Sequence, residues 1–435
     1  MSYDLAWSGF RDDALFLLDI CSREQGFDHP ILWYTLSWLA DSLGLKDQCR
    51  EYASRAEATN SLYCFPARLE EMIVLETIIR LGLSGAKAHY YLGNLYYDRR
   101  RYEEAIQCWR RSVELDAGFS IPWRNLGIAE FNVHRNAEAA SQMYERAMSV
   151  NNEDARVLYE WDQLKKRVGS ASPEERQLSL DKHPALVEHR DDLAVEYITL
   201  LNQCGKWQSA LQRMNARRFS PWEGGEGLVS TQFVYAHRAL GLEALAAGDA
   251  RRSLEHFEAA RQYPENLGEG KHLLTLERDL DYFSGLAAQA IGNPDAAQRF
   301  WKAAAAALQA IGVHSYFQGM ALREIGQREA AHAVFSSLAD FAAKQMAIEP
   351  QIDYFATSLP NLLLFDDDLA KRNRVESLLL SALAADGLGD SKVAIGGLKR
   401  LLTEDRNHLF AAQMLRWLSR EKIHPGDAVE VHLKQ

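Results

Sequence analysis

The stretch "AHYYLGNLYYDRRRYEEAIQCWRRSVELD", residues 88–116, has the pattern of two amphipathic helices joined by a turn at three consecutive arginines. A second stretch, "IPWRNLGIAEFNVHRNAEAASQMYERAMSVN", residues 121–151, repeats this pattern with one residue inserted in the turn. Gly93 of the first stretch and Gly127 of the second lie 34 residues apart. Self-similarity at a fixed period of this length predicts a helical repeat protein.

The repeat resembles the tetratricopeptide repeat (TPR), in which small residues and one large aromatic residue occupy set positions. The aromatic position holds Trp109 in the first copy and Tyr144 in the second. Small side chains let the two helices of a unit touch, and large ones fill the gap to the next helix. Further copies are centred on Gly241, Gly285 and Gly319. We therefore predict an all-α fold, a right-handed α-solenoid of TPR-like helix pairs with essentially no β-structure.

The regular spacing is interrupted near the middle of the chain, and again between Gly241 and Gly285, which lie 44 residues apart. The segment "KRVGSASPEER", residues 166–176, contains glycine, serine and proline between two helical patterns. These residue types mark turns and helix starts. The sequence therefore predicts an N-terminal lobe at 1–169 and a C-terminal lobe at 170–435, with long inter-repeat loops near 217–230 and 263–273.

Composition limits the possible functions. The net charge of -11 disfavours a nucleic-acid partner, because an acidic surface repels phosphate. Five cysteines without C-x-x-C spacing predict neither disulfides nor a zinc site, and favour a reducing, cytoplasmic location. No secretion signal or long apolar run is present, so no membrane association is expected. No nucleotide-binding loop or metal-binding motif occurs, so we expect no cofactor and no metal.

Two loops share an unusual composition. They are "SPWEGGEG", residues 220–227, and "YPENLGEGKH", residues 263–272. They are either connectors, in which proline ends a helix and glycine makes a turn, or a shared binding platform on one edge of the solenoid. The second alternative makes partner-binding residues of Trp222, Glu223, Glu226, Glu265, Asn266, Glu269, Lys271 and His272.

The first helix of each TPR unit lines the concave wall of the solenoid. The side chains expected on that wall are rich in aromatic rings, which suit a peptide, a loop of a neighbouring domain, or a sugar chain. Packing between repeats is the alternative for each ring. Members of the family that grip carboxylates have lysine where this chain has Tyr90. The predicted groove residues are Tyr90, Tyr91, Asn94, Tyr97, Arg124, Asn125, Phe131, Tyr282, Phe283, Tyr316 and Phe317.

A closer resemblance is carried by four motifs. They are "FPARLEEMIVL" (65–75), "IPWRNLG" (121–127), "PWEGGEG" (221–227) and "YPENLGEGKH" (263–272). Together they resemble the TPR C-terminal half of large bacterial proteins whose N-terminal half is the DUF5107 domain. The resemblance implies a β-rich N-terminal partner that acts on carbohydrate. It also implies that this chain is a fragment or a separately encoded half.

Two functions follow as alternatives. The first is a non-catalytic scaffold that docks a protein, either the N-terminal partner domain or a second copy of itself as a homo-oligomer. The second is a helical-toroid carbohydrate-active enzyme that uses acidic residues in a central groove. The 34-residue period favours the scaffold, and no catalytic residue is assigned. The acidic sets that the second alternative would use are Glu223 with Glu226, Glu265 with Glu269, and Asp366 to Asp368.

Overall fold

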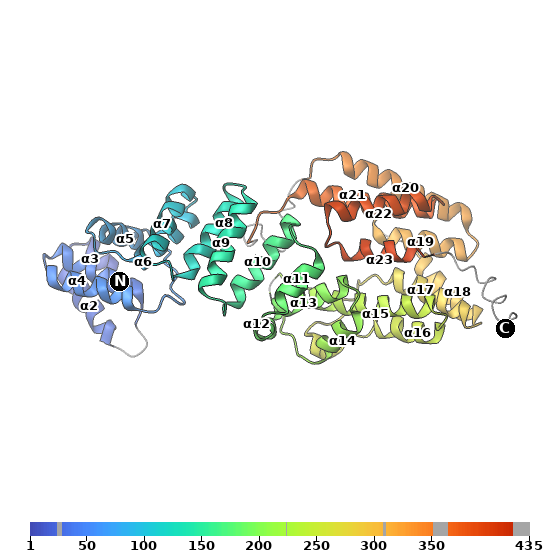
Figure 1. The fold of residues 1–435 in the computed structure, drawn as a ribbon, viewed down its shortest axis with the longest axis horizontal. Coiled ribbons are helices and arrows are strands. Elements are labelled where there is room, and N and C mark those ends of the chain that lie inside the picture. Colours follow the sequence, from blue (N-terminus) through green and yellow to red (C-terminus); the bar gives the residue numbers. More distant parts are fainter. Residues whose placement is uncertain (24–27, 223, 308–309, 351–363, 421–435) are drawn as a thin grey trace. The chain divides into compact units, whose positions relative to one another are not determined.

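The computed structural model describes residues 1–23, 28–222, 224–307, 310–350 and 364–420. Within these ranges all regular elements are helices, which confirms the predicted all-α fold (Figure 1). The chain divides into two compact units, Met1–Leu164 (unit 1) and Lys165–Gln435 (unit 2).

In unit 1, helices that follow one another in sequence pack as pairs. The pairs are α1 with α2, α3 with α4, α6 with α7 and α8 with α9, while α5 packs between α3 and α6. Helix α10 begins in unit 1 and ends in unit 2. The helices are α1 (Ser2–Trp7), α2 (Arg11–Arg23), α3 (Pro30–Ser42), α4 (Lys46–Ala58), α5 (Leu69–Arg80), α6 (Ala86–Asp98), α7 (Tyr102–Leu115), α8 (Ser120–Asn132), α9 (Ala137–Val150) and α10 (Ala155–Val168).

The helices of unit 2 pack in the same sequential way, from α13 with α14 to α21 with α22. Short helices α11 and α12 precede them, and α23 packs against α22 and against α13. The helices are α11 (Pro173–Leu180), α12 (Pro184–His189), α13 (Asp191–Gln203), α14 (Trp207–Asn215), α15 (Leu228–Ala246), α16 (Ala250–Ala259), α17 (Arg278–Ala290), α18 (Pro294–Ala305), α19 (Val313–Glu324), α20 (Arg328–Ala347), α21 (Leu369–Gly387), α22 (Ser391–Glu404) and α23 (Leu409–Leu418), with a 3-10 turn at Glu265–Leu267.

A close approach between a glycine and an aromatic ring sets the packing within five of the described pairs. A Cβ atom on Gly93 of α6 would lie 2.5 Å from Nε1 of Trp109 on α7, so only glycine leaves room for the indole. Gly127 stands in the same relation to Tyr144, where a Cβ would lie 2.7 Å from the ring. The contact recurs in unit 2 between Gly241 and Phe257, Gly285 and Trp301, and Gly319 and Phe335. The repeat register predicted from the sequence is therefore the register of the structure.

Local sequence also decides where the second helix of many pairs begins. An asparagine or aspartate precedes it, and its side-chain oxygen accepts a hydrogen bond from a backbone N–H in the first turn. That bond satisfies a donor that the helix itself leaves unpaired. Such caps are made by Asn136, Asp249, Asn293 and Asp390.

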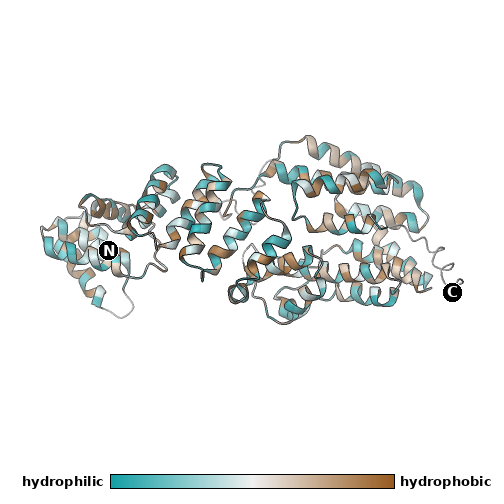
Figure 2. Cartoon of the chain, in the orientation of Figure 1, coloured by the Kyte–Doolittle hydropathy of each residue, from teal (hydrophilic) through white to brown (hydrophobic). Residues whose placement is uncertain are grey.

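The helices of both units carry hydrophobic residues on one side and polar residues on the other (Figure 2). In unit 1 the buried apolar side chains run from Ile31 on α3 to Ala129 on α8 in one cluster. In unit 2 a larger cluster extends from Leu242 on α15 to Met414 on α23. Each unit therefore has its own core, as expected for stacked helix pairs that bury their apolar faces against their neighbours.

Candidate functional site

An open groove with a volume of about 410 Å3 lies in unit 1. Helices α6, α8 and α10 contribute side chains to it, and the segment Phe65–Ala67 before α5 forms one lip. Four residues predicted for the groove line it, namely Tyr90, Asn94, Arg124 and Asn125. The first helices of consecutive units thus supply its polar surface.

A row of hydrogen bonds connects the polar side chains along the groove. Nδ2 of Asn125 donates to Oδ1 of Asn94 at 2.9 Å, and Nε1 of Trp109 donates to the same oxygen at 3.1 Å. Nη1 of Arg124 then donates to Oδ1 of Asn125 at 3.0 Å. These bonds link α6 to α8 and fix the orientation of both amide groups.

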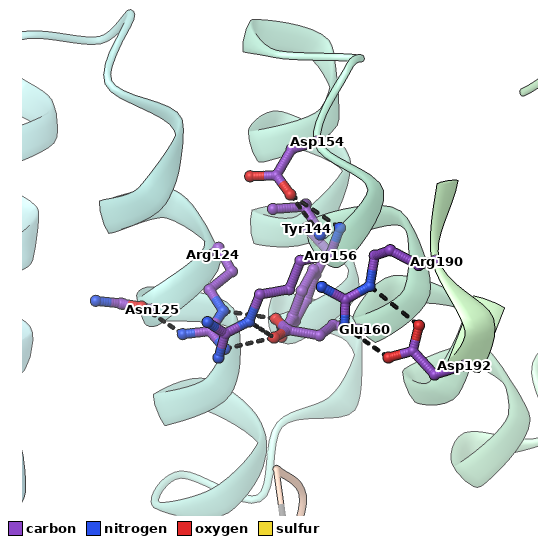
Figure 3. Close-up of polar contacts among 9 residues, drawn as sticks. Arg124, Asn125, Tyr144, Asp154, Arg156, Glu160, Arg190 and Asp192 are labelled. Atoms are coloured by element: carbon purple, nitrogen blue, oxygen red, sulfur yellow. Dashed lines mark hydrogen bonds and ion pairs between the residues drawn. The ribbon is translucent and has the colours of Figure 1, made fainter. Parts of the chain in front are cut away.

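The row ends at a buried carboxylate on α10. Glu160 accepts from Nε and Nη2 of Arg124 at 2.5 Å each, from Nε of Arg156 at 2.9 Å and from the hydroxyl of Tyr144 at 3.1 Å (Figure 3). Only 4% of the Glu160 side chain is exposed. Burial by itself would raise the pKa of Glu160, but the two guanidinium groups outweigh burial and hold the pKa below its usual range. The carboxylate therefore stays ionised and holds both arginines.

Arg156 is the exposed member of a set of two arginines and one glutamate that keeps a net positive charge. Its side chain is 60% exposed, and only its Nε is used in the bond to Glu160. Among the described residues its two Nη nitrogens have no hydrogen-bond partner. The two acids in the lining have other contacts, because Asp154 caps the backbone at the start of α10 and Asp98 lies 3.5 Å from Arg99. The Arg156 guanidinium is thus available to a carboxylate from outside.

Exposed apolar side chains lie on and beside one lip of the groove. Phe65 is 75% exposed and lines the groove, and Tyr63, two residues earlier, is 87% exposed. Leu62 and Leu69 of the same segment are also exposed. An exposed apolar patch beside a polar site is typical of a surface that binds another protein.

The other predicted groove residues lie elsewhere. Tyr91 is buried in the unit 1 core, Tyr97 packs against Tyr102 and Trp109, and Phe131 is half-buried on α8. In unit 2, the rings of Tyr282, Phe283, Tyr316 and Phe317 are all buried in the core. The five buried rings, those of Tyr91, Tyr282, Phe283, Tyr316 and Phe317, fill space between helices.

The loops around residues 220–227 and 263–272, both in unit 2, are joined to each other by hydrogen bonds. The backbone N–H of Phe219 donates to the carbonyl of Asn266 at 2.8 Å, and Nδ2 of Asn266 donates to the carbonyls of Met214 and Arg217 at 2.8 and 2.9 Å. The carboxylate of Glu269 accepts from the backbone N–H groups of Gly227 and Ser230, at 2.8 and 3.1 Å. Asn266 and Glu269 therefore hold the first loop and the start of α15 in place.

The remaining loop residues face outward or lie on the loop surface. Trp222 is half-buried and packs over Gly225, whereas Glu226, Glu265 and His272 are exposed. Lys271 pairs with Glu277 at 2.5 Å. Glu223 lies outside the described residues. The next residue after His272, Leu273, is 99% exposed, so the loop surface is partly apolar.

The acidic sets considered for catalysis have structural contacts. Glu269 caps α15, Asp368 caps α21, and Asp367 pairs with Arg167 and Arg372. Within the described residues, no cluster of histidine, cysteine or acidic side chains could hold a metal ion. Glu269, Asp367 and Asp368 therefore serve helix starts and ion pairs, whereas Glu226 and Glu265 lie exposed on the loop surface.

Sequence reasoning missed Arg156, Glu160 and the lip at Phe65. An arginine and a glutamate four residues apart are typical of a solvated helix face. The signal for a buried acid was nevertheless present, since Glu160 lies on the same helix face as the apolar residues Val157 and Leu164. The partner of that acid, Arg124, could not be found without the tertiary structure.

The helix pair that supplies part of the groove matches a known family. The tetratricopeptide repeat model matches residues 86–119, which span α6 and α7. The chain therefore contains a tetratricopeptide repeat. Among the described residues, no helix is both long and apolar enough to cross a bilayer.

Several solved structures are similar to the chain. The C-terminal part of a TPR repeat-containing protein from Cytophaga hutchinsonii is 11% identical, with 62% of this chain and 98% of that chain covered and a TM-score of 0.35. A tetratricopeptide repeat protein from Parabacteroides merdae is 16% identical, with 66% and 95% covered and a TM-score of 0.29. PilW, a type IV pilus biogenesis factor, is 15% identical, with 50% and 90% covered and a TM-score of 0.29. Similarity at this level gives no information about a ligand or partner of this chain.

Proposed function

We propose that this chain is a non-catalytic scaffold whose unit 1 groove binds an extended segment of a partner protein. The observation that carries the proposal is the exposed Arg156 guanidinium, whose Nε is bonded to buried Glu160 at the end of the Asn94–Asn125–Arg124 row. A carboxylate of the bound segment pairs with Arg156. An apolar side chain of the segment packs against Phe65 on the lip and against Tyr63 beside it.

The class of protein supports this function. Tetratricopeptide repeats generally mediate protein–protein interaction, and their helical fold is typically non-catalytic. Three of the carboxylates that a helical-toroid enzyme would use, Glu269, Asp367 and Asp368, instead cap helices or form ion pairs. All five cysteines are free thiols, which supports a reducing, cytoplasmic location.

The bonded loops of unit 2 form the second part of the scaffold. Trp222 is the apolar anchor of this platform, and Glu226, Glu265 and His272 are its polar rim. Because Asn266 and Glu269 already order the two loops, docking there costs little further backbone entropy. The resemblance to DUF5107 proteins supports a separately folded, carbohydrate-active N-terminal domain as the partner on this platform.

The groove is tested by selecting random dodecapeptides displayed on phage against the full chain. Selected peptides are expected to share an acidic residue next to an apolar one. Arg156→Ala should weaken their binding at least tenfold in a fluorescence anisotropy titration. Arg111→Ala is the matched control, because Arg111 is 54% exposed and pairs with Glu114 on its own helix. Equal affinity of Arg156→Ala and wild type would disprove the groove site.

The platform is tested with the triple variant Trp222→Ala, Glu265→Ala, His272→Ala. This variant keeps Asn266 and Glu269, so the loops should stay bonded and the thermal midpoint should change little. Co-purification with a separately expressed DUF5107-type N-terminal domain should be lost. Sedimentation velocity of the chain alone reports self-association. If the wild-type chain is a dimer and the variant is a monomer, the platform binds a second copy of this chain and not the partner domain. If co-purification and sedimentation are both unchanged in the variant, the loops only connect helices and form no binding platform.

A further inference from the structure

Helix α23 lies against the inner helices of unit 2 like a bound peptide. In Figure 1 it lies between α21 and α22 on one side and α15 and α17 on the other. Its ring contacts reach two helices, because Trp417 meets Phe283 of α17 at 5.2 Å between centroids and Phe410 meets Phe317 of α19 at 6.3 Å. The rings of Phe283 and Phe317 are therefore covered by the last described helix of the chain.

The apolar side of α23 has the spacing of a helix bound in a groove. Phe410, Met414 and Trp417 follow one another at positions i, i+4 and i+7, which places them on one helix face. Phe410 and Met414 are buried, with 7% and 1% of their surface exposed, and Trp417 is partly buried in the same cluster. These three side chains are the anchors of α23.

Two hydrogen bonds from arginines at and just beyond the end of α23 fix its orientation against α13 and α15. Nη2 of Arg416 donates to the carbonyl of Gln203, the last residue of α13, at 3.3 Å. Nη1 of Arg420 donates to the carbonyl of Leu242, in the last turns of α15, at 3.0 Å. The carbonyl of Gln203 lies at the C-terminus of α13, where carbonyls lack intrahelical partners and carry partial negative charge, so it attracts a guanidinium group.

The fit between α23 and its surroundings is incomplete at one end. A cavity of about 280 Å3 remains beside the start of the helix, lined by Arg238, His314, His408 and Phe410 among others. Two buried atoms of this lining, Nη2 of Arg238 and Nδ1 of His314, have no hydrogen-bond partner among the described residues. An empty space and unpaired buried donors or acceptors both reduce the stability of the bound helix.

We infer that the surface formed by Gln203, Arg238, Leu242, Phe283 and Phe317 is a helix-binding site that α23 occupies in cis. The partner that fits it is an amphipathic helix with aromatic residues at i and i+7 and arginines at i+6 and i+10, the pattern of Phe410, Trp417, Arg416 and Arg420. Such a helix competes with α23. A short connection gives α23 an effective concentration in the millimolar range, so a partner helix must bind the surface more tightly than α23 does.

Hydrogen exchange on the wild-type chain tests whether α23 opens by itself. Amides of α23 are expected to exchange at least tenfold faster than those of α17 and α21, which share its core cluster. The same protection for α23 and these helices would overturn the inference, because α23 would then be released only when unit 2 unfolds. This measurement needs no variant.

Peptide binding tests the recognition. The probe is a fluorescein-labelled peptide of residues 407–420, "NHLFAAQMLRWLSR", added to the full chain. The variant Phe410→Ala, Trp417→Ala weakens α23 in cis and leaves the surface intact, so it should bind the peptide at least tenfold more tightly than wild type. Adding Phe283→Ala should reverse this gain. A peptide with alanine at both aromatic positions is the control and should not bind. Equal binding of the labelled peptide to wild type and to the double variant would overturn the inference.

Discussion

Glu160 accepts two hydrogen bonds from Arg124 at 2.5 Å each, although only 4% of its own side chain and 14% of the Arg124 side chain are exposed. A bidentate pair at this depth joins α8 to α10 in unit 1. Removing one member of a buried ion pair leaves the other charge unpaired and desolvated. The groove therefore depends on this pair for its shape and for the position of Arg156.

Glu160→Gln should lower the free energy of unfolding by about 3–5 kcal/mol, because Arg124 stays buried without its counter-charge. Urea unfolding followed by circular dichroism measures the change. Glu114→Gln is the control, since the Glu114 side chain is 61% exposed, and should change the free energy by less than about 0.5 kcal/mol. Similar effects of the two changes would show that the Arg124–Glu160 pair is not a structural element.

Gly127→Ala should destabilise the chain by about 1–3 kcal/mol through overpacking. The new Cβ would lie 2.7 Å from the Tyr144 ring and 3.2 Å from the carbonyl oxygen of Ala140, and the Tyr144 ring is fully buried. Gly396→Ala in α22 is the matched change, because a Cβ there meets nothing within 4 Å. It should instead stabilise by about 0.5–1 kcal/mol, since glycine inside a helix is unfavourable relative to alanine. Denaturation midpoints of both variants check the opposite signs.

Glu269→Ala should destabilise unit 2 by about 0.5–2 kcal/mol, because two backbone N–H groups at the start of α15 lose their acceptor. Amides at 227–230 should exchange faster in this variant. Glu265→Ala, an exposed residue of the same loop, should leave both the stability and the exchange rates near those of wild type. Unchanged amide exchange in Glu269→Ala would show that Glu269 does not hold the start of α15 in place.

His237 and His256 should make stability depend on pH. Burial, and then the charge on His256, lowers the pKa of His237 to about 4, and burial followed by Arg252 lowers the pKa of His256. The two Nδ1 atoms lie 3.1 Å apart. Because the folded state disfavours the charged form, the contribution of His237 is present above its unfolded pKa of 6.5 and is lost as pH falls from there toward 4.

The measurement is the urea midpoint at pH 7.5 and at pH 5.0. The loss between these pH values should be smaller in His237→Gln than in wild type, because glutamine does not titrate. His134→Gln is the control for an exposed histidine whose pKa is raised by Glu130, and it should not reduce the loss. An identical pH dependence of His237→Gln and wild type would exclude the pair as its source.

The residues of the chain determine most of the fold locally. Gly93 and Trp109 are sixteen residues apart, and they meet because one short turn joins their helices. The same spacing recurs at Gly285 and Trp301, and an Asn293 cap starts the second helix of that pair. Contacts of this kind lie within one repeat, so periodicity and capping residues are enough to predict them.

Tertiary structure alone decided which of the predicted site residues are accessible. Helical periodicity places Phe283 and Phe317 on an inner face, but it does not say that Trp417 and Phe410 cover them. It likewise does not pair Glu160 with Arg124, or direct Asn266 toward the preceding loop. The physical reason is that a helical pattern specifies which side of a helix is apolar, whereas the partner of each side chain depends on how successive helix pairs stack. Those partners lie in other repeats, where no local spacing connects them.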